Sequence, residues 1–232
     1  KVYQGVFDEH TLLSLENLKR RKYFDELGQA IKTGKEGDVY FAYRNNSTLA
    51  IKIFRITSAN FKKISQYIIR DFRFRTIQGN MRKVIMAWSQ KEFRNLQILY
   101  RSQVNVPYAY KQLQNVIVMD YIDGEMLKDS VIDNPQEIFD QVKEQLHLML
   151  HQARLIHGDL SEYNMMLDKN DIVYIIDVGQ AMGFKSKQDF REFEDLFIRD
   201  VENVCRFFNK KFSLDIDSKQ LCAELQEGLF EE

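Results

Sequence analysis

The sequence has little proline, little cysteine and almost no net charge. Its 232 residues include only 2 prolines, Pro107 and Pro135, and 2 cysteines, Cys205 and Cys222. Two thiols in a chain of this length are typical of a reduced, intracellular protein, so we expect both to be structural and the protein to be cytoplasmic. No uncharged apolar run approaches the ~20 residues of a membrane-spanning helix. The composition also excludes collagen, short disulfide scaffolds and disordered chains.

The charge is unevenly distributed along the chain. A net charge of −1 excludes a chain-wide attraction to nucleic acid or to an anionic membrane. From Phe61 to Arg101, however, ten basic residues stand against two acidic ones, which gives this stretch +8 and leaves −9 for the rest. The basic residues are Lys62, Lys63, Arg70, Arg73, Arg75, Arg82, Lys83, Lys91, Arg94 and Arg101. With Phe72, Phe74 and Trp88 among them, they suit contact with RNA phosphates and bases, although a solvated basic helix face explains them equally well.

The first half of the chain predicts a helix, a set of strands and a second helix. Helical spacing indicates a helix near residues 10–24, and short apolar runs indicate strands at 30–33, 39–43, 49–56 and 116–119. A helix over 82–100 carries an apolar stripe, and Glu92 lies on that stripe. A carboxylate that points toward the core is costly unless a cation pairs with it.

The second half predicts a hinge followed by a mostly helical region. The apolar pattern breaks at residues 120–124, where we expect the hinge. Asn134 caps a long helix that begins with Pro135, and the capping box from Ser186 to Asp189 starts a final helix that runs through Phe208. Two short strands at 165–167 and 172–176 lie between these helices.

The residues that can carry chemistry follow these elements. Asp159 lies in the segment His157-Gly158-Asp159, Asn164 follows five residues later, and Asp177 ends a predicted strand. Phosphoryl transfer to a hydroxyl needs a carboxylate near the acceptor proton, and an amide oxygen and a second carboxylate for Mg²⁺. A turn aspartate with a hydrogen-bonded asparagine is the plain structural interpretation. Asp177 can also act as a nucleophile toward the γ-phosphate.

A lysine and a glycine-containing turn complete this pattern. Lys52 lies among apolar residues in the predicted strand 49–56, and Glu92 supplies the partner that both charges require. A lysine held in this way binds the α- and β-phosphates of ATP. Upstream, glycines at 34 and 37 would let backbone amides approach a nucleotide. This turn is no Walker loop, because Glu36 follows Gly34-Lys35 where Mg²⁺ would need a Ser or Thr.

Four segments together resemble the RIO family of atypical serine protein kinases. They are Thr33-Gly34-Lys35-Glu36 with Asp38-Val39-Tyr40, the block WSQKEFRNL at 88–96, HGDLSEYN at 157–164 and IDVGQ at 176–180. The resemblance covers about residues 5–212 and is closer to the first subfamily, because no winged-helix domain fits before Ala30. It implies a compact α+β protein-kinase-like fold with two lobes. The N-lobe would span 1–119 with a basic insert at about 57–83, the hinge 120–124, and a reduced helical C-lobe 125–232.

The resemblance also implies the roles of individual residues. Lys52, Asp159 and Asp177 would be catalytic, and Asn164 and Asp177 would bind Mg²⁺, or Mn²⁺ in its place. The ATP-binding residues would be Thr33, Gly34, Lys35, Glu36, Val39, Lys52, Glu92, Met119, Asp120, Ile122 and Asn164. The adenine would lie along the backbone from Asp120 to Ile122. Kinase and ATPase activity would serve maturation of the small ribosomal subunit, with the pre-ribosomal particle as the partner and its RNA contacted through 61–101.

Some positions depart from the family pattern and leave alternatives open. Lys32 and Gly37 replace residues common around the TGKE motif, and Phe72 and Met81 stand where prolines are common. Gly158 replaces the arginine of the usual H-R-D, so control by a phosphorylated activation loop is not expected.

Two other functions remain open. One alternative is a small-molecule phosphotransferase of the aminoglycoside type. Another is a non-catalytic ribosome-assembly factor that uses nucleotide as a conformational switch.

Overall fold

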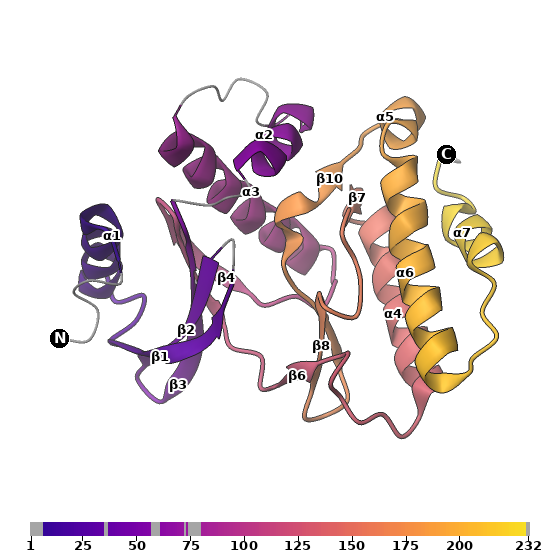
Figure 1. Cartoon of the computed structure of the whole chain (residues 1–232), viewed down its shortest axis with the longest axis horizontal. Helices are drawn as coiled ribbons and strands as arrows, with labels where there is room; N and C mark the ends of the chain where they lie inside the picture. The colour runs from indigo at the N-terminus through magenta and orange to yellow at the C-terminus, as the bar shows by residue number, and fades with distance from the viewer. Residues whose placement is uncertain (1–6, 35–36, 57–60, 72, 74–79, 231–232) are drawn as a thin grey trace. The chain divides into compact units, whose positions relative to one another are not determined.

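The chain folds into two units, and one helix belongs partly to each (Figure 1). The computed structural model describes residues 7–34, 37–56, 61–71, 73 and 80–230. The first unit contains residues 1–94 and 108–121, and the second contains 95–107 and 122–232. Within the described part of the chain, no helix has both the length and the apolar character needed to cross a membrane.

An antiparallel sheet of five strands forms the first unit, in the order β1-β2-β3-β5-β4. The strands are β1 (Glu26–Thr33), β2 (Gly37–Arg44), β3 (Ser47–Phe54), β4 (Ala109–Leu113) and β5 (Val116–Asp120). Strands β2 and β3 pair along their whole length, from Gly37 opposite Phe54 to Arg44 opposite Ser47. A tight turn joins them, and Asn45 in that turn has a φ of 52°, a conformation that asparagine tolerates well.

Helix α1 (Glu9–Arg20) packs on this sheet. Asp8 caps it, because the Asp8 side chain accepts a hydrogen bond from the Thr11 backbone amide at 2.8 Å. Leu15 and Leu18 enter a core that the central strands complete with Tyr40, Ala42, Leu49, Ile51, Ile53, Val116 and Val118. The apolar spacing that predicted a helix here is therefore the spacing that buries its inner face.

Helices α2 and α3 lie between β3 and β4. Helix α2 (Phe61–Arg70) lies inside the predicted basic insert, and it buries Ile64 and Ile68. Helix α3 (Met81–Arg101) follows, with Met81–Arg94 in the first unit and the remainder in the second. Its predicted stripe is confirmed: Ile85, Trp88, Glu92, Leu96 and Leu99 are all buried.

Helices and two small sheets form the second unit. One sheet has the order β6-β8-β9 and the other pairs β10 with β7. The elements are β6 (Gly124–Met126), α4 (Pro135–His151), β7 (Leu155–Ile156), β8 (Met165–Asp168), β9 (Val173–Ile175), η1 (Val178–Gln180), β10 (Met182–Gly183), α5 (Lys187–Arg191), α6 (Glu194–Phe212) and α7 (Ser218–Gln226). Asn134 caps α4 and Ser186 forms the predicted capping box of α5.

The structure differs from the sequence-based expectation in the final helix and in one boundary. The prediction of a single helix from Ser186 through Phe208 was wrong, because Phe193 leaves the helical region (φ −125°, ψ 8°) and separates α5 from α6. The buried apolar spacing continues across the break, so the pattern could not reveal it. Residues 95–107, expected in the first lobe, group with the second unit. Within that unit Asn95 donates to the Val178 carbonyl and the Asn105 amide donates to Gln145.

The two cysteines are buried and form no disulfide. Cys205 lies in α6 and Cys222 in α7, and burial raises the pKa of each thiol to about 11. The thiols therefore stay protonated at neutral pH and act as small packing groups.

Candidate active site

A buried ion pair joins the central sheet of the first unit to helix α3. The Lys52 ammonium in β3 donates to both carboxylate oxygens of Glu92, at 2.7 and 2.8 Å. The side chains are 12% and 2% exposed. Burying an unpaired carboxylate to this degree costs several kcal/mol of folding free energy. Lys52 is therefore the cationic partner that the position of Glu92 on the apolar stripe predicted. Lys52 lies opposite Val39 in the sheet, so the pair fixes one cation beside strand β2.

The glycine-containing turn between β1 and β2 is tied together by its own backbone. The Gly34 amide donates to the Gly37 carbonyl at 3.0 Å and to the Asp38 carboxylate at 3.3 Å. Asp38 in turn accepts two hydrogen bonds from Arg55, at 2.9 and 2.7 Å. A Cβ atom at Gly37 would lie 2.6 Å from the Ile53 carbonyl oxygen, so only glycine fits this approach. Lys35 and Glu36, predicted to bind ATP, lie outside the described residues.

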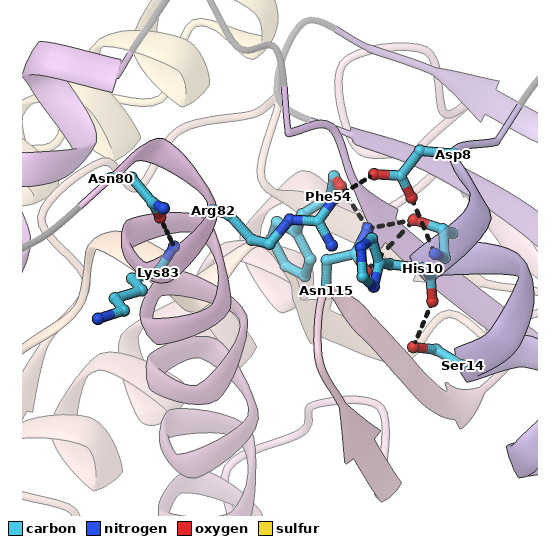
Figure 2. Close-up of polar contacts among 9 residues, drawn as sticks. Asp8, His10, Ser14, Phe54, Asn80, Arg82, Lys83 and Asn115 are labelled. Atoms are coloured by element: carbon cyan, nitrogen blue, oxygen red, sulfur yellow. Dashed lines mark hydrogen bonds and ion pairs between the residues drawn. The ribbon is translucent and has the colours of Figure 1, made fainter.

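Polar contacts hold the beginning of α3 near α1 and the end of β3 (Figure 2). Asp8, the cap of α1, forms an ion pair with Arg82 at 2.8 Å. The Asn115 side chain donates to the Phe54 carbonyl at 2.9 Å and to the Thr11 hydroxyl at 3.0 Å. These bonds fix the two elements that carry Lys52 and Glu92 against the same helix.

The predicted adenine-binding segment begins at the end of β5. Met119 pairs with Ala50 and with Ala109 in the sheet. The Asp120 carboxylate accepts a hydrogen bond from the Tyr110 hydroxyl at 2.6 Å. Ile122 belongs to the second unit, and its carbonyl accepts from the Gly124 amide at 3.1 Å.

In the second unit, side chains fix the loop that carries Asp159. The Gln180 amide donates to Asp159 Oδ2 at 2.7 Å, and the Asn164 amide donates to the Asp159 carbonyl at 2.7 Å. Asp159 is half-buried. Because Gln180 holds Oδ2, the orientation of the whole carboxylate, including its second oxygen Oδ1, is fixed. The arrangement suits a carboxylate that accepts a proton from a hydroxyl.

Asn164 and Asp177 lie at the same end of the paired strands β8 and β9. Asn164 directly precedes β8, Asp177 follows β9, and the Ile176 amide donates to the Asn164 carbonyl at 3.0 Å. Because the Asn164 amide nitrogen already donates to Asp159, the oxygen is the end left to coordinate a cation. One amide oxygen and one carboxylate fit Mg²⁺, which keeps several waters and takes other ligands from substrate phosphates. The described residues contain no group of three or more His, Cys, Asp or Glu side chains placed to hold a metal alone.

Sequence reasoning missed a buried aspartate beneath this loop. Asp200 in α6 accepts hydrogen bonds from the Gly158 and Leu160 amides, at 2.7 and 2.8 Å. Arg199 donates to the Gly158 carbonyl. Gly158 has a φ of +78°, a conformation that favours glycine. Burial raises the pKa of Asp200 to about 6, although His157 and the two amides oppose that rise. No motif in the sequence identifies Asp200, because it acts on a segment 42 positions away.

The structure therefore brings the predicted residues together in two sets, one in each unit. Lys52 and Glu92 form the first set, and Asp159, Asn164 and Asp177 form the second. Gln180, which sequence analysis quoted only as part of a motif, belongs to the second set through its bond to Asp159.

Comparison with known proteins places these residues in a family. The family model described as "RIO domain" matches residues 38–221. A RIO-type serine/threonine-protein kinase Rio1 from Haloferax volcanii is 34% identical over 227 residues, which cover 95% of this chain and 76% of the relative. A protein of the same name from Methanocaldococcus jannaschii is 34% identical over 226 residues, with the same shares of coverage. The crystal structure of the Rio2 kinase-ADP/Mg2+-phosphoaspartate complex from Chaetomium thermophilum has a TM-score of 0.71 and 25% identity, covering 95% of this chain and 68% of that chain.

The raised pKa of Asp200 predicts how stability depends on pH. Its pKa is about 6 when folded against 3.8 for an ordinary aspartate, so between these values the folded state binds more protons than the unfolded state. The free energy of unfolding contributed by this group therefore falls as pH rises from about 4 to 6. We expect Asp200→Asn to remove that slope in urea denaturation between pH 4 and 7. Asp195→Asn, an exposed change on the same helix, should keep it, and an unchanged slope in Asp200→Asn would contradict the assignment.

Proposed function

Because this chain belongs to the RIO family of atypical serine/threonine protein kinases, we propose that it uses ATP and Mg²⁺ as kinase and ATPase in maturation of the small ribosomal subunit. Its fold is α+β and kinase-like, and the relatives named above are kinases. The ribosomal part of the proposal rests on the sequence resemblance. Kinase relatives favour a protein substrate over the small molecule of an aminoglycoside-type phosphotransferase.

The buried Lys52–Glu92 ion pair carries the ATP-binding part of the proposal. A lysine held by a carboxylate is the group that contacts the α- and β-phosphates in kinases. Thr33, Gly34, Val39 and the backbone of Met119, Asp120 and Ile122 would contact the rest of the nucleotide. The solved Rio2 complex named above contains ADP and Mg²⁺, which supports the same ligands here.

The second set of residues supports a phosphoryl-transfer mechanism. Asp159 would accept the proton of the attacking hydroxyl through Oδ1 while Gln180 holds Oδ2. Asn164 and Asp177 would hold Mg²⁺, which neutralises charge on the phosphates when it is bound. The phosphorus–oxygen bond to the leaving ADP breaks as the new bond to the acceptor oxygen forms.

One experiment separates the proposed function from its alternatives. ATP hydrolysis and ³²P transfer would be measured for the protein alone, with pre-ribosomal particles and with a generic protein substrate. Stimulation by the particles alone supports a role in ribosome maturation. Equal phosphorylation of generic proteins would contradict it. Nucleotide binding without any turnover would favour a non-catalytic switch.

We expect Asp159→Ala to lower kcat by about a hundredfold or more while ATP still binds. The proposed base touches the acceptor hydroxyl and not the nucleotide, and general base catalysis contributes about 10²–10⁴-fold. Turnover and ATP affinity would be measured by radiometric assay and calorimetry. Asp133→Ala, which removes an exposed carboxylate, is the control. Retained turnover in Asp159→Ala would show that another group accepts the proton.

Asp177→Ala should weaken nucleotide binding in Mg²⁺ as well as the rate. This carboxylate would hold the Mg²⁺ that neutralises the phosphates, so its loss should reduce the difference between the nucleotide affinities measured in Mg²⁺ and in EDTA. The same variant tests whether Asp177 is itself a nucleophile. Attack of its oxygen on the γ-phosphate with loss of ADP would give an acyl phosphate, which hydroxylamine cleaves. A label on the wild-type protein that resists hydroxylamine would rule out the phospho-aspartate.

The proposed RNA contact needs fewer residues than the sequence indicated. Within the basic stretch, Lys91 is fully buried and Arg73 pairs with Asp71, so neither can meet a phosphate directly. Arg75 lies outside the described residues, while Arg70 and Lys83 are exposed. The RNA-facing part of 61–101 is therefore proposed to include Arg70 and Lys83.

Replacing Arg70 and Lys83 together by alanine should weaken binding to pre-ribosomal RNA and flatten its salt dependence. Removing one cation that meets a phosphate should reduce the slope of log K against log salt by roughly one. The measurement is RNA affinity by fluorescence anisotropy at several salt concentrations. If RNA affinity and slope are unchanged but ATP binding is abolished, the stretch is a nucleotide lid.

A further inference from the structure

A cluster of three charged side chains, two of them fully buried, lies between the end of α2 and helix α3. The Asp71 carboxylate accepts three hydrogen bonds from Arg73, one from its backbone amide at 3.0 Å and two from its guanidinium at 2.9 and 2.6 Å. The Lys91 ammonium lies 3.6 Å from Asp71 Oδ2. The side chains of Asp71 and Lys91 are both 0% exposed, and that of Arg73 is 15% exposed. We refer to Asp71, Arg73 and Lys91 as the charge cluster.

The charge cluster contains one more cation than it has carboxylates. Burial lowers the pKa of Lys91 to about 7, and Arg73 adds to this effect while Asp71 and Glu92 oppose it. Burial alone would raise the pKa of Asp71, but the bonds and charge of Arg73, with Lys91, hold it below its usual value. The Trp88 ring lies 5.6 Å from the Lys91 ammonium. The charged form of Lys91 is therefore less favourable in the folded protein than in water.

A buried cation that shares its carboxylate with a second cation is poor evidence for a stabilising role. Replacing buried ionic groups by apolar residues of similar size is often neutral or stabilising. The position of Lys91 offers another role, because Glu92 is its neighbour on α3. Successive helical residues point about 100° apart, so Lys91 reaches the charge cluster while Glu92 reaches Lys52. Two adjacent residues thereby hold α3 on two sides.

We propose that the charge cluster is a positioning device: Arg73 fixes the Asp71 carboxylate, Asp71 attracts the Lys91 ammonium, and Glu92 is thereby kept directed at Lys52. This inference rests on the proposed role of Lys52 in binding ATP. It gives the long connection between β3 and α3 a function within the first unit. Asp71 and Arg73 would thus set the rotation of α3 through Lys91, and that rotation would position the Lys52 ammonium for the phosphates.

The test replaces Lys91 by methionine, which keeps the approximate length of the side chain and removes its charge. We expect the KM for ATP to rise about fivefold or more, the lower range of typical coupling between sites, with a smaller change in kcat. The melting temperature at pH 6 should be unchanged or higher, because a buried cation has been removed. Lys19→Met, which removes an exposed lysine of the same unit, should change neither quantity.

The pH dependence supplies a readout that a merely structural role would not change. Between about pH 7 and 10.5 the folded protein holds Lys91 less protonated than the unfolded chain does. As pH rises, Lys91 in the folded protein loses its proton. Both the free-energy cost of burying its charge and its attraction to the Asp71 carboxylate therefore decrease. The KM for ATP of the wild type should rise from pH 6.5 to pH 8.5. In Lys91→Met, the KM for ATP should stay at its raised value and should not show this increase between pH 6.5 and pH 8.5.

A double variant tests whether Asp71 acts through Lys91. Asp71→Asn should raise the KM for ATP with a lower melting temperature, because the buried Lys91 and the largely buried Arg73 lose their charged partner. Combining it with Lys91→Met should produce no further increase in KM if both act through one interaction. Additive increases would contradict the proposal.

The outcomes separate this inference from the proposed function. If the wild type neither binds nor turns over ATP, the proposed function fails. If the wild type does both and Lys91→Met has the wild-type KM and pH profile, the positioning role is wrong. Unfolding of Lys91→Met, detected by circular dichroism, would also overturn it, because the lysine would then be required for stability.

Discussion

The Lys52–Glu92 ion pair is the interaction that constrains the first unit most strongly. Both charges are largely removed from water, with a 2% exposed carboxylate and a 12% exposed ammonium, and each would be costly without the other. The pair forms only if a central strand and helix α3 keep a fixed register. Two further contacts hold α3: Asp8 pairs with Arg82 at one end of the helix, and Asp71 lies 3.6 Å from Lys91, the neighbour of Glu92.

In the second unit, hydrogen bonds fix the loop that carries Asp159, which has no regular secondary structure. Asp159 lies in a segment whose backbone amides and carbonyls are satisfied by side chains from other elements. Asp200 accepts from two amides, Asn164 donates to the Asp159 carbonyl, and Gln180 holds the carboxylate. Buried backbone groups must be paired somewhere, and here their pairing orients the group that would accept a proton.

Local signals predicted several helices, strands and caps, whereas some long-range contacts could not be found from the sequence. The caps at Asn134 and Ser186 were predictable because each involves residues three positions apart. The partnership of Lys52 and Glu92 was also predictable, since a charge on an apolar stripe demands a partner. Asp200 was missed because it is one aspartate among apolar residues of an amphipathic helix, and its partners are backbone amides. Helix α2 was not predicted as an element, because its segment was assigned only to a basic insert at about 57–83.

Counting charges along the sequence treated all ten basic residues between Phe61 and Arg101 as alike, and the structure divides them. Lys91 and Arg73 are turned inward to one carboxylate, whereas Arg70 and Lys83 face solvent. The Arg73 guanidinium donates two hydrogen bonds to the buried Asp71 carboxylate. The N–H groups that make these bonds cannot donate to a phosphate at the same time. The connection between β3 and α3 therefore carries Asp71 and Arg73 facing inward and Arg70 facing solvent.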